Sequence, residues 1–259
     1  ASASIGRTEV PGVGSDRCIA NAFCLACVPS GRKLNTESLS RTATAEELHA
    51  VTPIRRDGVR LVRCIPESMA LVLGSRQSEH LIDLRRAAQR NIEVIRRRSG
   101  GGIVLVDPHR SLWIDIEIGA DDSRYVAEPL GMMAQVGRWW LAALISLDCA
   151  FPGIWQFVGQ TGSDSDGELV CFAGRSHGEL MVEQSKLVGL SQRRTRDGAR
   201  VQGQLHFVDP TDEILALLVE EAPGPLRRPA IVDEQDRDVL NDRFLDALTL
   251  VVGASLSGR

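Results

Sequence analysis

The sequence predicts an α+β fold with a mixed or antiparallel β-sheet. Short apolar runs of strand length recur along most of the chain, beside a few stretches with helical spacing. These strands and helices do not alternate strictly, as they would in a doubly wound parallel sheet. The chain has 259 residues, of which 43% are hydrophobic, and this size and composition suit one globular domain.

The N-terminal part differs from the rest in composition. Residues 1–42 are rich in Ser, Gly, Thr and Arg and show no sustained periodicity, which predicts a mostly flexible segment with one short element near Ile19–Val28. The folded domain is expected over residues 43–259. Thr44 stands three residues before Glu47, the spacing of a capping box, so a short helix should start there.

The next segments predict mainly strands. Val59–Ile65 alternates around charged residues, and Met69–Leu73 is a continuous apolar run, so both should be strands. Leu81–Arg90 has helical spacing, and Ile92–Ile95 follows it as another predicted strand.

Two more strands and the longest helix are expected in the middle of the chain. Ile103–Val106 and Leu112–Ile118 resemble successive strands joined by a hairpin-like connection at Asp107–Arg110. Apolar residues recur at helical spacing over Arg124–Leu147, which predicts the longest helix. Beyond it we expect four short strands or strand pairs among 155–158, 168–172, 179–183, 187–192 and 201–207, and then helices at 211–220 and 233–251.

Charge, hydropathy and cysteine usage narrow the function classes. A net charge of −4 gives no reason to expect nucleic acid or an anionic membrane as the main partner. No stretch reaches the roughly 18 to 20 apolar residues of a membrane span, and the start lacks the pattern of a secretory signal. The six cysteines are spread irregularly, as expected for reduced thiols in the cytoplasm. Cys24 and Cys27 have the spacing of a metal motif, but no second pair follows at zinc-site distance, so buried apolar cysteines are expected instead.

Two distant segments indicate the chemistry. Arg96–Val104 has the pattern of a strand that ends in an arginine cluster and a three-glycine turn, where backbone N–H groups can approach a phosphate closely. Lys186–Gln192 adds one isolated lysine. A guanidinium binds an oxyanion with a fork of donors, and an ammonium binds it as a point charge. Taken singly, these residues also fit a solvated strand end, a tight turn and a surface lysine.

These segments carry a family resemblance. Arg96–Val104 and Lys186–Arg193 are similar to the two signatures of lipoate-protein ligase A and its relatives in the biotin and lipoate protein ligase superfamily, the second around an essential lysine. Ala70–Gln77 resembles the strand and G-x-x-Q turn that line the same pocket. The resemblance covers residues from about 44 to 220. It implies an α+β catalytic domain with a central mixed sheet flanked by helices, and an apolar tunnel for a medium-chain acyl group.

The resemblance also implies roles for individual residues. Arg97 and the backbone after the glycines would hold the phosphate or acyl carboxyl, and Lys186 would reach the same oxygens. The positions that match nucleotide and acyl-adenylate contacts are Arg97, Gly101, Gly102, Ile103, Val104, Leu105 and Lys186. The implied reaction transfers lipoate or octanoate to the lysine of a lipoyl domain or a glycine-cleavage H-type carrier protein. A ligase would use ATP with Mg as its cofactors.

A second resemblance concerns Cys171. Cys171 and Phe172, upstream of Lys186, are similar to the cysteine loop of octanoyltransferases that share the ligase fold. In those enzymes the cysteine takes the octanoyl group from acyl carrier protein as an acyl-enzyme and passes it to a lipoyl domain, without ATP. Cys171 would then be catalytic beside Lys186, because a neighbouring positive charge favours the nucleophilic thiolate. Alternatively, Cys171 is a small buried hydrophobe in a strand.

Length bears on the same choice. Full-length ligases of the family commonly add a C-terminal accessory domain, whereas only one helical stretch follows the family region here. We therefore expect either a transferase or a ligase core that borrows the accessory domain from a separate polypeptide.

The chain also departs from the family pattern. Val106 replaces the family's histidine after the glycines, Ile103 replaces an alanine, and His109 stands where a glycine is usual, while Asp107 is kept. Leu190 replaces a small residue, which would reshape the acyl tunnel. These departures leave room for another acyl group, or for a non-catalytic relative that binds an acyl carrier, a lipoyl domain or a nucleotide.

Overall fold

The computed structural model describes residues 35–53, 55, 57–149, 151–159 and 165–255. The short element predicted near Ile19–Val28 and the pair Cys24 and Cys27 lie outside these residues. Every described residue belongs to one compact unit, Arg32–Arg259. Among the described residues, no helix is long and apolar enough to cross a membrane.

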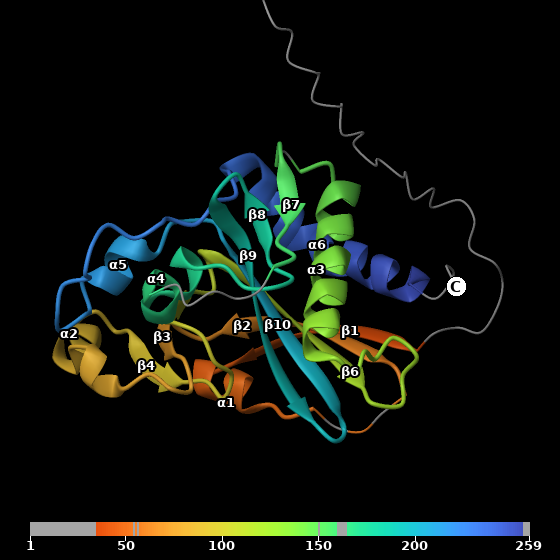
Figure 1. The fold of residues 1–259 in the computed structure, drawn as a ribbon, viewed down its shortest axis with the longest axis horizontal. Coiled ribbons are helices and arrows are strands. Elements are labelled where there is room, and N and C mark those ends of the chain that lie inside the picture. The colour runs from red at the N-terminus through yellow and green to blue at the C-terminus, as the bar shows by residue number, and fades with distance from the viewer. Residues whose placement is uncertain (1–34, 54, 56, 150, 160–164, 256–259) are drawn as a thin grey trace, which may run out of the picture. The chain divides into compact units, whose positions relative to one another are not determined.

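A seven-stranded sheet runs through this unit (Figure 1). The strand order is β1 (Thr36–Ala43), β2 (Val59–Pro66), β6 (Ser111–Gly119), β10 (Gly198–His206), β9 (Ser185–Thr195), β8 (Leu180–Val182) and β7 (Ile154–Gln156). Strands β1 and β2 are parallel, and all the other neighbours are antiparallel. The sheet is therefore mixed, and the predicted α+β class is confirmed.

Three short strands form a second sheet. Their order is β4 (Glu93–Arg96), β3 (Ala70–Leu73) and β5 (Val104–Val106), with β3 parallel to β4 and antiparallel to β5. The prediction of a hairpin between β5 and β6 is wrong, because these consecutive strands lie in different sheets. The carboxylate of Asp107 accepts hydrogen bonds from the backbone N–H of His109 and Arg110, at 2.7 and 3.1 Å, and this turn leads the chain from one sheet to the other.

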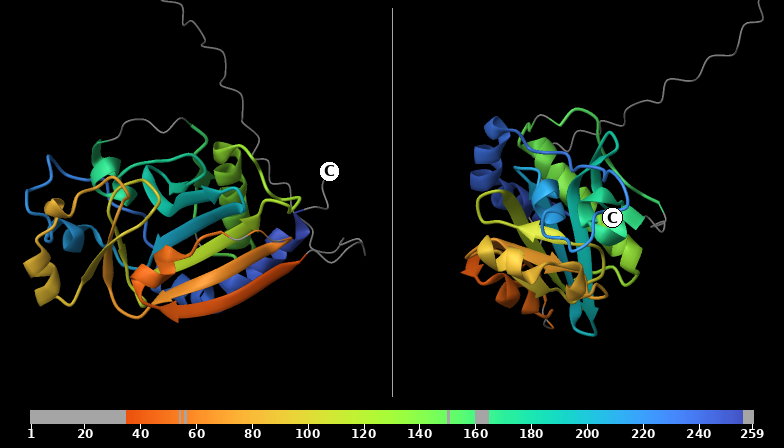
Figure 2. Two further views of the ribbon diagram at one scale, coloured as in Figure 1. Left: turned by 90° about the horizontal axis from the view of Figure 1, so that it is seen from below. Right: turned by 90° about the vertical axis from the view of Figure 1, so that its left-hand side faces the viewer.

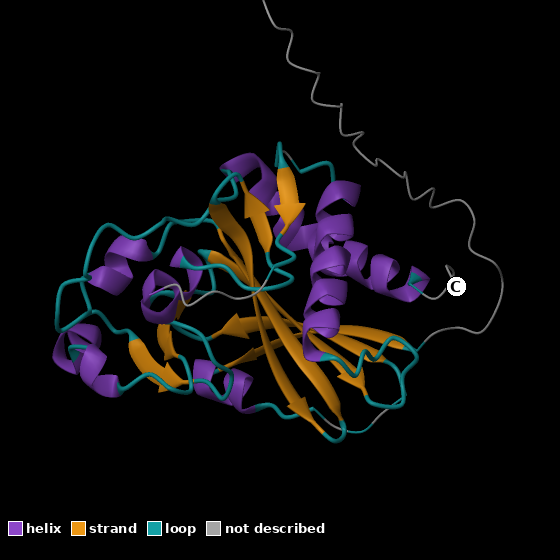
Figure 3. Ribbon diagram, viewed as in Figure 1, coloured by secondary structure: helices purple, strands orange, loops and turns teal. Residues whose placement is uncertain are grey.

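Two long helices pack together against one face of the large sheet. They are α3 (Pro129–Ser146) and α6 (Glu234–Ala254), and the rings of Trp140 and Phe244 meet between them at 4.6 Å. Figure 2 shows α6 in blue along the sheet, and Figure 3 shows both helices in purple. The longest helix is α6, with 21 residues against 18 for α3, so the prediction for Arg124–Leu147 was wrong on this point. Pro129 and the N-cap Glu128 start α3 later than the apolar spacing suggested.

Short helices complete the unit. The predicted capping box of Thr44 and Glu47 is present at the start of α1 (Ala45–Ala50). The others are the 3₁₀ helices η1 (Glu79–Leu81) and η2 (Cys171–Ala173) and the helices α2 (Leu84–Gln89), α4 (Ser165–Leu169) and α5 (Thr211–Leu215). Residues 168–172 are therefore the one predicted apolar run of the second half that forms no strand.

The two faces of β3 belong to different cores. Ala70 and Val72 pack with α1, Trp113 and Phe172 in a cluster between the two sheets. Leu71 and Leu73 pack on the opposite side with residues of α2 and with Leu217. This alternation follows from the period of two in a strand, and it places β5 and η2 next to the large sheet.

The first strand corrects the predicted N-terminal boundary. β1 occupies Thr36–Ala43, so the last part of the segment predicted to be flexible pairs with β2. Its Ser, Thr, Glu and Arg side chains are mostly exposed, and only Ala43 is buried. An edge strand with so little buried apolar surface lacks the alternation by which strands are recognised in a sequence.

Candidate functional site

The glycine turn and the G-x-x-Q turn meet directly. Gly101 has a φ of +100°, and a Cβ built on Gly74 would lie 1.9 Å from the carbonyl oxygen of Gly101. Ser75 donates its backbone N–H to the carbonyl of Ser99 at 3.0 Å. Two of the predicted motifs are thus one structural unit, and it depends on glycine at both close positions.

Arg97 holds this turn from within. Its Nε and Nη2 donate to the carbonyl of Gly100 at 3.2 and 3.0 Å, and Nη2 also donates to the carbonyl of Gly102 at 2.9 Å. The side chain is buried, with 5% of the residue exposed. The guanidinium therefore fixes the backbone of the turn, and Nη1 is the nitrogen for which the described residues provide no hydrogen bond.

The segment that carries Cys171 is anchored to the same turn. Gln77 donates from Nε2 to the carbonyls of Glu168 and Leu169, at 2.8 and 3.1 Å. Ile103 donates its N–H to the carbonyl of Leu169 and accepts the N–H of Cys171, both at 2.9 Å. As a result, the Cys171 Sγ lies 3.9 Å from the position that a Cβ on Gly101 would occupy.

Lys186 forms a buried ion pair with Glu179. Its Nζ lies 2.9 and 2.8 Å from the two carboxylate oxygens, and it also donates to the carbonyl of Cys171 at 2.6 Å. Only 2% of Lys186 and 1% of Glu179 are exposed. The carboxylate accepts the backbone N–H groups of Ser176 and Leu190 as well, at 2.6 and 3.2 Å. Every part of the pair is therefore hydrogen-bonded, which a buried charge pair requires.

The electrostatics keep this lysine charged. Burial opposes the charge, but attraction to Glu179 and then to the Cys171 thiol outweighs it and raises the pKa of Lys186. For the carboxyl of Glu179, burial is the largest influence and raises the pKa, while Lys186 and the two N–H donors oppose it. At neutral pH the ammonium is protonated and held beside Cys171.

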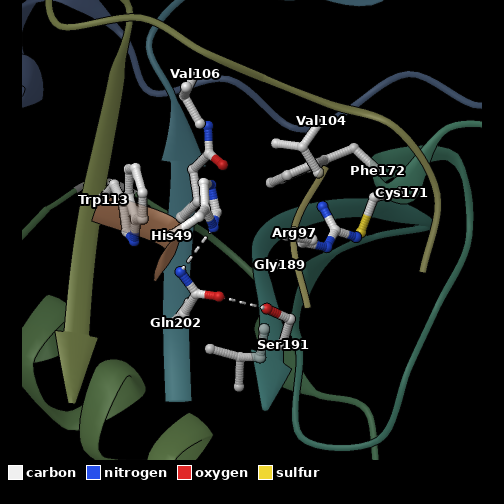
Figure 4. Close-up of a pocket in the computed structure, with 12 residues that line it drawn as sticks. His49, Arg97, Val104, Val106, Trp113, Cys171, Phe172, Gly189, Ser191 and Gln202 are labelled. Atoms are coloured by element: carbon white, nitrogen blue, oxygen red, sulfur yellow. Dashed lines mark hydrogen bonds between the residues drawn. The ribbon is translucent and has the colours of Figure 1, made fainter. Parts of the chain in front are cut away.

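A pocket opens on the other side of Cys171, between the two sheets (Figure 4). Its apolar walls are formed by Val104, Val106, Trp113, Phe172 and Leu190. Its polar lining is formed by His49, Arg97, Cys171, Ser191, Gln202 and Gln204. The free space is about 40 Å³, enough for a few water-sized groups. The pocket is therefore narrow, and about half of its lining residues are apolar.

The chain matches the family model described as the lipoyl protein ligase A/B catalytic domain over residues 42–223. It belongs to this family. No curated protein matches the sequence.

Solved structures of the family share the fold. A protein of T. acidophilum with bound lipoic acid has 17% identity and a TM-score of 0.59, covering 86% of this chain and 85% of its own. A lipoate-protein ligase A bound with ATP has 17% identity and a TM-score of 0.58, with 86% and 84% covered. A bi-partite lipoate protein ligase of Thermoplasma acidophilum, solved in a study of that ligase and its E2 lipoyl domain, has 14% identity and a TM-score of 0.56, with 86% and 83% covered.

The residues predicted for the site of this lipoyl protein ligase domain fall into three places. Arg97, Val104 and Cys171 line the pocket. Lys186 lies behind the pocket wall, with its Nζ 5.5 Å from the ring centroid of Phe172. Gly101 and Gly102 form the turn, and the side chains of Ile103 and Leu105 are buried in the core on the far side of β3. The structure thus places these residues around one turn and one pocket, and only part of the predicted set faces the cavity.

Three functional candidates were missed from the sequence. Glu179 is the partner of Lys186, and the charged residue directly before the apolar strand β8 was its only signal. His49 and Gln202 line the polar side of the pocket, and neither belongs to a motif. His109, which stands near the family's missing histidine, is exposed in the turn after β5 and brings no imidazole to the pocket.

Proposed function

We propose that this domain transfers a lipoyl or octanoyl group to the lysine of a lipoyl-carrier domain. The observation that carries the proposal is the buried pair of Lys186 and Glu179, whose ammonium touches Cys171 at the glycine turn. The family match supports acyl transfer, and the solved structures with lipoic acid and with ATP support a ligase.

In the ligase reaction, a carboxylate oxygen of the acid attacks the α-phosphorus of ATP and pyrophosphate leaves. The carrier lysine then attacks the acyl carbonyl, an amide forms and AMP leaves. From behind the pocket wall, the positive charge of Lys186 would stabilise the negative charge that develops on the phosphate or acyl oxygen, a contribution that is large in a water-poor site. Arg97 would act mainly by holding the backbone N–H groups of the glycine turn in place.

The same residues support a second route. The Cys171 thiol lies in the pocket beside Gly101, and the ammonium of Lys186 attracts its ionised form. The thiolate would attack the acyl carbonyl of octanoyl acyl carrier protein and release the carrier thiol. The lysine of the lipoyl domain would then attack the thioester on Cys171 and restore the free thiol, with no need for ATP.

The two routes differ in what they bind. ATP would lie outside the narrow acyl pocket, towards the glycine turn. Among the described residues, no group of three or more His, Cys, Asp and Glu side chains is placed to hold a metal ion. For a ligase, a separate polypeptide supplying the accessory domain fits the bi-partite organisation of the Thermoplasma enzyme.

Intact-mass measurement of a lipoyl domain tests the proposal. The domain should gain one lipoyl or octanoyl mass with this protein and either ATP plus the free acid or octanoyl acyl carrier protein. Lys186→Met should abolish the gain, while Arg196→Ala, which changes a side chain that is 93% exposed, should not. An acyl adduct on the protein that is lost in Cys171→Ser identifies the transferase, and ATP dependence identifies the ligase.

Two results would oppose the proposal. Full transfer by Lys186→Met would remove this lysine from the mechanism. No transfer from any donor, with accessory polypeptides of the family added, would favour the non-catalytic binding protein.

A further inference from the structure

One pocket residue has an unused hydrogen-bonding group. The Nε2 of His49 is buried and has no hydrogen-bond partner among the described residues. The imidazole lines the pocket and stacks on Trp113, with ring centroids 4.5 Å apart. A buried polar atom without a partner is rare in a native protein, so a partner is expected to come from a ligand.

A chain of hydrogen bonds determines whether the Nε2 of His49 carries the proton of the ring. Ser99 of the glycine turn donates from Oγ to the Oγ of Ser191 at 3.3 Å, and Ser191 donates to the Oε1 of Gln202 at 3.5 Å. The Nε2 of Gln202 then faces the Nδ1 of His49 at 3.2 Å. An amide nitrogen can only donate, so Nδ1 accepts and the proton of the neutral ring lies on Nε2. His49 therefore carries an N–H donor in the wall of the pocket.

The ring is neutral throughout the physiological pH range. Burial, followed by the positive charges of Arg97 and Arg200, lowers the pKa of His49 to about 3. A neutral ring needs no counter-ion, so an uncharged acceptor is sufficient as the partner of its N–H group.

The donor lies away from the reacting end of the pocket. In Figure 4, His49 and Trp113 stand on one side, and Cys171 and the glycine-turn residue Arg97 stand on the other. Apolar side chains such as Val104 and Leu190 line the same pocket. An acyl group with its carbonyl at Cys171 would pass this apolar wall and place its distal carbons near His49.

We propose that His49 selects acyl chains that carry a hydrogen-bond acceptor near the distal end, and so disfavours a plain saturated chain. The inference rests on the proposed function and specifies its substrate class. A neutral oxo group is the strongest acceptor of this kind, and the sulfur atoms of a dithiolane are weaker ones. A saturated octanoyl chain leaves the N–H without a partner, which is the situation that most strongly lowers the affinity for an analogue.

Binding measurements on the intact protein test this selection without requiring turnover. Isothermal titration would compare octanoate with lipoate and with octanoates that carry one oxo group at carbon 5, 6 or 7. We expect at least one oxo acid to bind about tenfold or more tightly than octanoate, and lipoate to fall between them. In His49→Phe, which keeps an aromatic ring on Trp113, the ratio should fall to about twofold or less. Gln202→Leu removes the amide that keeps the proton of His49 on Nε2. It should also reduce the ratio, but by a smaller factor than His49→Phe does.

The controls separate this inference from the proposed function. His80→Phe changes an exposed histidine and should keep the parent ratio. Octanoate that binds as tightly as every oxo acid would overturn the inference, as would a preference that survives in His49→Phe. If acyl transfer to a lipoyl domain is intact in either case, only the inference fails. If no donor supports transfer, the proposed function fails as well.

Discussion

Two buried ion pairs of this protein are alike in geometry and differ in surroundings. The pair of Lys186 and Glu179 has an N···O distance of 2.8 Å, and that of Arg124 and Asp122 has one of 2.7 Å. No side chain of either pair is more than 3% exposed. Arg124 also donates to the hydroxyl of Thr36 at 2.8 Å and to the carbonyl of Val252 at 3.3 Å, so its pair joins the start of β1 to the end of α6.

The comparison shows that burial and pairing alone do not indicate catalysis. In the pair of Arg124 and Asp122, the guanidinium also donates to the ends of a strand and a helix, so this pair holds the fold together. We call it the clamp. The Lys186 pair is directed at the carbonyl of a cysteine residue that lines a pocket. The chemical character of each pair is therefore set by the groups it faces, and breaking either pair should affect a different property.

The largest effects should come from removing one cation of each pair. We expect Lys186→Met to lower acyl transfer by about 10² to 10³-fold, the cost of losing one electrostatic donor in a catalytic site. Arg124→Met should instead lower the free energy of unfolding by about 3 to 5 kcal/mol, because it leaves Asp122 charged and buried. Acyl transfer per folded molecule and urea unfolding measure the two effects. If Arg124→Met lost transfer per folded molecule as strongly as Lys186→Met, the two ion pairs would not have the different roles assigned to them.

Acid should weaken the pocket region before it weakens the clamp. Burial lowers the pKa of His206, which packs on Phe172, to about 3, as it does for His49. An unfolded chain protonates each histidine near pH 6.5, whereas the native chain does not. Stability is thus lost as pH falls from about 6.5 towards 3, by about 1.4 kcal/mol per pH unit for each histidine.

The clamp should respond only in stronger acid. Burial opposes its charge, but hydrogen bonds from Arg124 outweigh burial and lower the pKa of Asp122. The contribution of Asp122 is present above its unfolded pKa and disappears only as pH falls through the lower native value. Relative to the intrinsic amide rate at each pH, protection from hydrogen exchange should therefore fall more between pH 7 and pH 5 in α1 and the end of β10 than around Asp122. An equal loss of protection in both regions would contradict this order.

A single methyl group on the glycine turn should have a moderate effect. Gly101→Ala forces a positive φ on alanine and brings its Cβ within 2.8 Å of the Arg97 Nη2. We expect about tenfold slower acyl transfer, equivalent to about 1.4 kcal/mol, from the distorted turn. Gly100→Ala is the matched control, because a Cβ there meets no atom within 4 Å. Equal losses in both variants would show that the turn geometry is not the cause.

The smallest effect should come from widening the acyl pocket. Leu190 is 5% exposed and lines the pocket, so Leu190→Ala enlarges a narrow space while keeping the backbone N–H that this residue donates to Glu179. We expect the ratio of kcat/KM for a twelve-carbon over an eight-carbon acid to rise by about fourfold, the factor equivalent to about 0.8 kcal/mol for one buried methylene. A ratio that stays constant would mean that Leu190 does not limit chain length.

Local patterns predicted much of the fold. Thr44 and Glu47 identified the start of α1, and the apolar runs identified β2, β3 and four strands of the second half. The same reasoning missed β1, because its mostly exposed side chains show no alternation of polar and apolar residues. It also misplaced the connection after β5, because the choice between pairing with β6 and pairing with β3 is made by packing between sheets.

The site was predictable where its residues form motifs. The glycine turn, Cys171 and Lys186 are local signatures, and the structure brings them together. His49 could not be found in this way, because its role depends on the contact of α1 with Gln202 of β10, far away in the sequence. Glu179 lies in the segment between Cys171 and Lys186, but its pairing depends on the register between β8 and β9.

The central claim is that the positive charge of Lys186, held by Glu179 beside Cys171, is required for acyl transfer. A variant with both Lys186→Met and Glu179→Gln tests it most directly, because it removes both charges and leaves no unpaired ion to unfold the protein. We predict near-native circular dichroism and thermal unfolding, with transfer to a lipoyl domain at least about 100-fold below the parent. A folded double variant that retains transfer within about threefold of the parent would contradict the account.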